Sequence, residues 1–163
     1  MPGQDNLMNI RIKNTIFHHL INVICVLQLA GIAIYLIVAW GGIPDLVPGH
    51  YNAAGEVTRW DGKGILIVMP IISAVLFIGM VIIERFPKTW NTGVKITEQN
   101  MARVYTIVKN MLGVIKLVIV TAFVFIAFFM SLSVALPGWF LPAFLAFIFA
   151  PVIFYTILLY RAR

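Results

Sequence analysis

Residues 117–134 have the sequence LVIVTAFVFIAFFMSLSV, an uninterrupted run of uncharged and mainly apolar side chains. A helix needs about 20 such residues to cross the hydrocarbon core of a bilayer, so this run predicts a transmembrane helix, placed with its flanking residues at 111–134. Three further stretches have the same character, at residues 16–40, 65–84 and 139–160. All four must be helical, because a lone strand would leave its backbone groups unpaired in lipid.

The composition of the 163-residue chain agrees with a membrane protein. Hydrophobic residues make up 61% of it and charged residues 11%, whereas soluble domains carry about 25% charged residues. A soluble domain of this size would also expose too much of that apolar surface. We therefore expect one domain, residues 1–163, folded as an all-α four-helix bundle in the lipid bilayer. The sequence indicates no nucleic-acid partner and no cofactor.

The basic residues predict the orientation of the bundle. Ten of the twelve Lys and Arg residues fall on one side of the predicted spans, and only Arg59 and Lys63 fall on the other. The ten are Arg11, Lys13, Arg85, Lys88, Lys95, Arg103, Lys109, Lys116, Arg161 and Arg163. The positive-inside rule then places both termini in the cytoplasm and the loop at residues 41–63 outside the cytoplasmic membrane.

Residues 97–116 are expected to extend the third helix into the cytoplasm. Their polar and basic side chains fall on one face of a helix and their apolar side chains mostly on the other. One helix over residues 97–134 would be about 57 Å long, more than a bilayer core requires. This amphipathic extension could lie against headgroups, pack on its own bundle or hold a partner. At its end, we expect Lys116 to reach back to the membrane interface.

The first predicted span carries a polar stripe of His18 and Asn22, with Gln28 on its flank. Asn and Gln in spans commonly form hydrogen bonds between helices. His18 lies near the cytoplasmic boundary, where we expect it at the level of the headgroups. Ionisable groups in membranes can also be functional, so the stripe is one candidate site. No acid lies in the interior of a predicted span, which argues against a proton or cation transporter.

The loop GGIPDLVPGHYNAAGEVTRWDGK at residues 41–63 is the second candidate site. Helix connections usually need only about 2–8 residues. Its polar side chains could bind a cation or a peptide, or could hydrogen-bond the loop's own backbone so that it caps the bundle. It has no recognised metal-ligand spacing and no nucleophile–base pair, so we expect neither a metal site nor catalysis. The candidate binding residues are His50, Asn52, Gly55, Glu56, Trp60 and Lys63.

A family resemblance rests on the sequence VPGHYNAAGE at residues 47–56, followed by Trp60 and Lys63. It resembles the pattern of DUF1648, a bacterial membrane family of unknown function. In that pattern Ile/Val-Pro-x-His-aromatic-Asn-x-x-Gly precedes an aromatic residue and a Lys. The motif and its flanking spans cover residues 16–76, and Thr58 departs from the Asp or Asn common in the family. The domain also forms the first part of SdpI-type immunity proteins. The resemblance implies a prokaryotic cytoplasmic-membrane protein. In an immunity protein it would further imply protection from a secreted peptide toxin and control of a cytoplasmic repressor.

Two functional hypotheses follow. The first is a non-enzymatic membrane protein whose ordered outer loop recognises a peptide, a lipid or a partner subunit, with a role in immunity or signalling. The alternative is an accessory subunit of a larger membrane enzyme or transporter. In that case the Phe-rich span at residues 139–160 would pack against a helix of the partner.

Overall fold

The computed structural model describes residues 12–163, so Arg11, one of the cations used to predict the orientation, lies outside the described residues. The chain forms four long helices, α1 (Ile16–Ala39), α2 (Val68–Ile83), α3 (Met101–Ser131) and α4 (Phe140–Arg161). Together with their adjoining helical turns, all four are long and apolar enough to cross a membrane. The prediction of four helices with the length and composition of membrane spans is confirmed.

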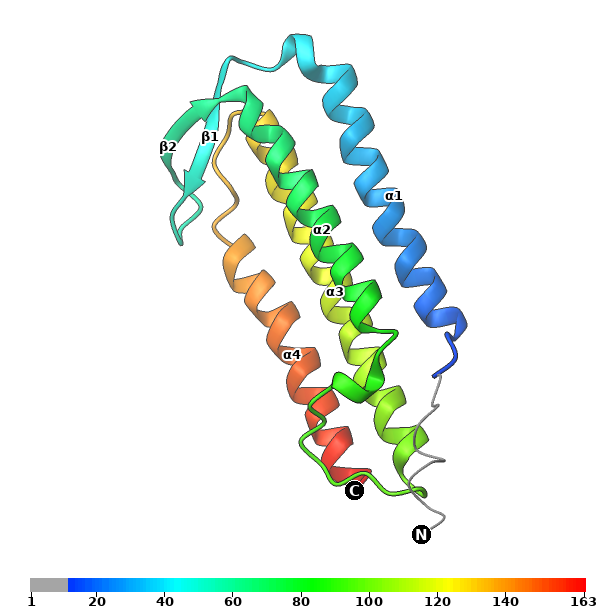
Figure 1. The fold of residues 1–163 in the computed structure, drawn as a ribbon. Helices are drawn as coiled ribbons and strands as arrows, with labels where there is room; N and C mark the ends of the chain where they lie inside the picture. The colour runs from blue at the N-terminus through cyan, green and yellow to red at the C-terminus, as the bar shows by residue number, and fades with distance from the viewer. Residues whose placement is uncertain (1–11) are drawn as a thin grey trace.

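Helix α3 is the centre of the bundle, and it packs against each of the other three helices (Figure 1). Three buried hydrophobic clusters hold the helices together, and every one includes residues of α3, for example Met130, Val120 and Val108. The connection at Pro137–Gly138 returns the chain, so that α4 lies antiparallel along α3 (Figure 1). A Pro–Gly pair is typical of a tight turn, so the sequence itself indicates that these two helices are antiparallel neighbours.

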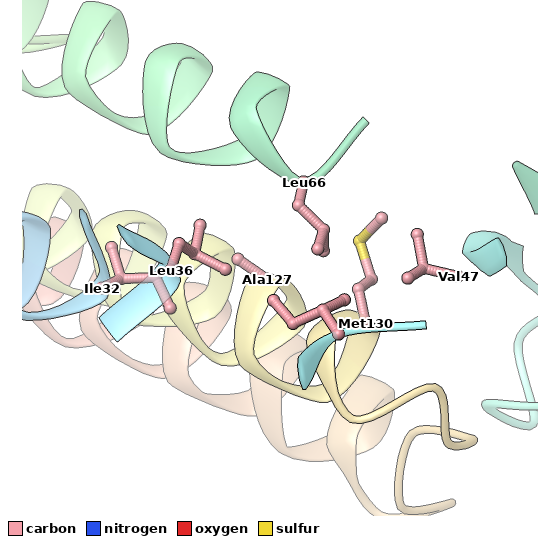
Figure 2. Close-up of a cluster of buried hydrophobic side chains, with 7 residues drawn as sticks. Ile32, Leu36, Val47, Leu66, Ala127 and Met130 are labelled. Atoms are coloured by element: carbon pink, nitrogen blue, oxygen red, sulfur yellow. The ribbon is translucent and has the colours of Figure 1, made fainter. Parts of the chain in front are cut away.

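The largest cluster lies at the end of the bundle that carries the connection from α1 to α2, which we call the hairpin end. The opposite end, where α1 begins and α4 ends, is the terminal end (Figure 1). Figure 2 shows Met130 of α3 between Leu66 and Val47. The full cluster consists of Ile32, Leu36, Ile43, Val47, Leu66, Ala127 and Met130. The connection is thus part of the hydrophobic core rather than a detached loop.

The connection itself contains a β-hairpin, formed by β1 (Leu46–Tyr51) and β2 (Val57–Gly62), which pair antiparallel. Short 3₁₀ turns flank it, η2 (Trp40–Gly42) before and η3 (Lys63–Ile67) after. The all-α prediction is therefore wrong in this segment. The β-branched and aromatic side chains here favour strands, and pairing satisfies backbone groups that lie against an apolar bundle.

Helix α3 is shorter than the predicted helix over residues 97–134. Before its first residue, the N–H of Thr97 donates to Asn100 Oδ1 at 2.8 Å, and the N–H of Asn100 donates to Thr97 Oγ1 at 3.3 Å. This reciprocal pair closes the turn from which the helix begins. At the other end Ser133 has a φ of 56° and stops the helix.

The basic extension of α3 packs on its own bundle, one of the three arrangements considered from the sequence. Val104 and Val108 are buried against Leu159 and Ala162 at the end of α4. The connection between α2 and α3 contains a further short 3₁₀ turn, η4 (Pro87–Thr89). The polar face of the extension is partly turned inward, because both Lys109 and Lys116 are buried.

Candidate functional site

The turn between the two strands is closed by the side chain of Asn52. Its Oδ1 accepts hydrogen bonds from the backbone N–H groups of Ala54 (2.9 Å) and Glu56 (3.0 Å), and its Nδ2 donates to Glu56 Oε2 at 2.7 Å. Asn is suited to such turns because its short amide reaches backbone groups a few residues on. The structure thus brings Asn52 and Glu56 together, in contact with each other and with their own loop.

Gly55 fixes the turn onto the rest of the bundle. Its backbone has a φ of 86°, a conformation that glycine adopts without strain. Its carbonyl accepts a hydrogen bond from the N–H of Leu136 at 2.8 Å. A Cβ at this position would collide with the carbonyl oxygen of Leu136. Only a glycine therefore lets the hairpin turn contact the connection between α3 and α4.

The strands carry polar pairs across and along the hairpin. His50 Nδ1 lies 2.6 Å from Thr58 Oγ1 on the opposite strand. Along β2, Arg59 and Asp61 form an exposed ion pair with an N–O distance of 2.7 Å. Next to them, the ring of Trp60 is 50% exposed and belongs to none of the three buried clusters. Trp60 is therefore the large apolar group that β2 presents outward.

Lys63 ties the two ends of the connection together. Its Nζ lies 3.0 Å from Asp45 Oδ1, and its backbone N–H donates to the carbonyl of Asp45 at 2.8 Å. The same ammonium group lies 5.8 Å from the centre of the Trp40 ring, within the range of a cation–π contact. Lys63 thus joins the end of α1 to the start of η3.

Tyr51 was not singled out from the sequence, although it occupies the aromatic position of the quoted motif. Its hydroxyl donates to the carbonyl of Val134, beyond the end of α3, at 3.0 Å. Burial raises the pKa of this phenol to about 12. The contact anchors β1 to the bundle, as Gly55 anchors the turn.

A cavity of about 440 Å³ lies beneath the hairpin, against the connection between α3 and α4. Among the residues that line it are His50, Tyr51, Asn52, Gly55, Leu136 and Phe140. Three of the six predicted binding residues therefore surround one space. Glu56, Trp60 and Lys63 do not line it.

The polar stripe of α1 divides into two parts. Gln28 donates from Nε2 to Thr121 Oγ1 of α3 at 3.0 Å, a hydrogen bond between helices. His18 is only 2% exposed and faces α3 at Gly113, so its side chain points into the bundle rather than away from it. Its Nδ1 accepts from the backbone N–H of Thr15 at 3.1 Å. Asn22 lies one turn further along α1, at a different cavity.

The hairpin lies within a segment that matches a family model. Residues 27–74 match the model of a domain of unknown function (DUF1648). The resemblance seen in the sequence is confirmed. The DUF1648 match runs from α1 through the hairpin into α2, and it includes Gln28 and all six candidate residues of the connection. No curated protein and no solved structure matches the chain.

Outside the DUF1648 match, α2 and α3 are joined by a buried ion pair that was not predicted from the sequence. Lys116 Nζ lies 2.7 Å from Glu84 Oε1, and the two side chains are 1% and 7% exposed. The expectation that Lys116 reaches the membrane interface is therefore wrong, because Glu84 provides a nearer partner. The positions of the two residues in the sequence could have indicated this pair. Glu84 ends one span and Lys116 lies inside the next, so the antiparallel helices bring opposite charges to a similar depth.

Proposed function

We propose that the protein is a non-enzymatic membrane protein that recognises an extended peptide segment through the outer edge of β2. The arrangement of the hairpin carries this proposal. The sheet has the order β1–β2, β1 contacts α3, and β2 lies on the outer side with most of its residues exposed (Figure 1). An open strand edge offers backbone N–H and C=O groups to a further strand, the way in which several domains bind peptides.

The six candidate residues then have two kinds of role. Asn52, Gly55, Glu56 and Lys63 hold the hairpin in place through the contacts described above. A rigid edge loses little conformational freedom on binding, which favours affinity. Trp60, half exposed on β2, would contact side chains of the bound segment, as exposed aromatic residues often do in interfaces. His50 lines the cavity behind the strand and would accept a side chain there.

The charge distribution supports recognition on the extracytoplasmic side, because the terminal end carries most of the cations. In an immunity role, the hairpin would bind a secreted peptide before it reaches the bilayer. The basic segment at the start of α3 would then report occupancy to a cytoplasmic partner.

The test uses the full chain in lipid nanodiscs, panned against a phage-displayed library of random peptides. We expect enriched peptides to bind the wild type and to lose at least about tenfold in affinity for Trp60→Ala, the usual scale of an aromatic hot spot. Trp139→Ala is the matched control, because Trp139 is also exposed at the hairpin end, on the α4 side. Equal loss in both variants, or no enrichment over empty nanodiscs, would refute recognition by β2.

A second candidate function, an accessory subunit, is favoured by α4. This helix packs mainly on α3, and its large side chains Phe147, Phe149, Ile153, Phe154 and Ile157 are exposed. An apolar groove of about 340 Å³ runs between α3 and α4, lined by several phenylalanine rings. Purification in mild detergent followed by mass spectrometry distinguishes the two functions. A stoichiometric partner that is lost with Phe147→Ala would favour the subunit, and a chain that purifies alone would oppose it.

A further inference from the structure

The terminal end holds a cavity of about 650 Å³ between the start of α1, the end of α2 and α3. It is lined by charged and polar side chains that the hairpin function does not use. Those that matter here are Lys13, Asn22, Glu84, Arg85 and Lys109. Lys13 and Arg85 are exposed at the rim, whereas Glu84 and Lys109 are buried.

The buried charges around this cavity do not balance. Among the described residues, the buried charged side chains are Glu84, Lys109 and Lys116. Glu84 is already paired with Lys116. Lys109, only 3% exposed, donates to the carbonyl of Ile12 at 2.7 Å, a neutral partner. An ammonium group held away from water is costly unless a negative charge accompanies it, so an anion in the cavity would stabilise Lys109.

Two buried polar atoms of α1, one of them at the cavity, lack a hydrogen-bond partner among the described residues. His18 Nδ1 accepts from the backbone of Thr15, so the proton of the neutral ring is on Nε2, and this buried donor has no acceptor among the described residues. Asn22 Oδ1 is likewise buried without a donor. The two residues are one turn apart on one face of α1, and Asn22 lines the cavity. Among the described residues, the cavity therefore offers an unused acceptor, Asn22 Oδ1, and a buried cation, Lys109, without a counter-charge.

We infer that this cavity binds a phosphate group, and that an anionic glycerophospholipid of the inner leaflet supplies it. The phosphodiester would contact Lys109, Lys13 and Arg85, and a headgroup hydroxyl would donate to Asn22. Basic cavities between transmembrane helices at this membrane level commonly bind such headgroups. A soluble phosphate compound has the same chemistry, so the test must separate the two sources.

The test titrates the full chain in detergent with phosphatidylglycerol or phosphatidylcholine and counts bound lipid by native mass spectrometry. We expect phosphatidylglycerol to bind at least about tenfold more tightly, because three cations line the cavity. In parallel, inorganic phosphate and glycerol 3-phosphate are added to the protein in phosphatidylcholine nanodiscs, and thermal unfolding is followed. A lipid source leaves unfolding unchanged by either soluble compound, whereas a soluble source raises Tm. A protein that responds to neither lipid headgroup nor soluble phosphate has no such site.

Variants locate the binding. Lys109→Met should remove at least about tenfold of the affinity for phosphatidylglycerol. In phosphatidylcholine alone it should not lower Tm, because it removes an unpaired buried charge, and this distinguishes lost binding from lost folding. The double variant Lys13→Gln/Arg85→Gln changes only the exposed rim and should lower affinity severalfold.

The control is Lys88→Gln/Lys95→Gln, which removes the same charge from exposed positions of the terminal end that do not line the cavity. It should bind phosphatidylglycerol like the wild type. Equal losses in the rim and control variants would indicate diffuse attraction and overturn the site. A variant at Asp5, the only acid in the sequence of residues 1–11, tests whether the chain itself supplies the counter-charge of Lys109. Asp5→Asn should leave the affinity unchanged, and a large increase would show that the chain itself fills the cavity.

Discussion

At Gly55 a single hydrogen atom in place of a side chain determines how the hairpin meets the bundle. Gly93 has a similar positive φ, 66°, but nothing lies within 4 Å of an added Cβ, so it is a matched control. Gly93→Ala should cost about 1 kcal/mol of unfolding free energy, from backbone strain alone. Gly55→Ala should cost about 2–4 kcal/mol, because strain and the collision with Leu136 add. Thermal unfolding in detergent measures both, and equal costs would mean that the contact with Leu136 is unimportant.

The phenol of Tyr51 gives the hairpin a dependence on pH. Burial raises its pKa to about 12, whereas an unfolded Tyr has a pKa of about 10. The folded state thus holds the proton more tightly, so its contribution is complete below about pH 10 and is lost as the pH rises to about 12. Wild type should lose stability more steeply than Tyr51→Phe over this interval. At pH 7 the variant should be about 1 kcal/mol less stable, from the lost bond to Val134. Parallel curves would contradict this role.

Among the contacts between helices, we expect the buried Glu84–Lys116 ion pair to stabilise the packing of α2 on α3. Glu84→Gln leaves the ammonium of Lys116 buried without a counter-charge and should destabilise the protein by about 3–5 kcal/mol. The double variant Glu84→Gln/Lys116→Met removes both charges and should recover most of that loss. Unfolding in phosphatidylcholine nanodiscs measures the stability of the wild type, the single variant and the double variant. A double variant as unstable as the single one would show that the pair is not the source of the effect.

The more exposed ion pair between Lys63 and Asp45 is the control for the buried pair. The side chain of Asp45 is 91% exposed and that of Lys63 is 27% exposed, so water solvates the carboxylate almost fully and the ammonium group in part. Asp45→Asn should therefore change the unfolding free energy by less than about 1 kcal/mol. If it costs as much as Glu84→Gln, the difference in burial between the two pairs does not determine their energetics.

For the whole molecule, local apolar runs were enough to predict the four helices, and the Pro137–Gly138 turn was enough to place α4 beside α3. The motif around His50 was enough to predict the resemblance to DUF1648, which the match at residues 27–74 confirms. The hairpin itself was missed because its strands are short and interrupted by Pro48 and Gly49, which weaken the alternation typical of strands. The cavity at the terminal end was missed because Asn22, Glu84 and Lys109 come from α1, the end of α2 and α3. Their proximity depends on helix packing, which no local pattern encodes.

The same architecture makes membrane orientation directly testable, since the two ends carry distinct exposed positions. Cys25 is buried among Ile21 and Val120, so a Cys25→Ala background, which adds no polar group there, should retain the fold. In that background Ala53→Cys places a thiol at the tip of the hairpin, and Lys95→Cys places one at the terminal end, both at exposed positions. The charge distribution predicts that a membrane-impermeant maleimide labels Ala53→Cys in intact cells and labels Lys95→Cys only after lysis. The reverse pattern would place the hairpin in the cytoplasm. Recognition of an extracytoplasmic peptide would then be excluded, and the cavity lined by Lys109 would face the outer leaflet.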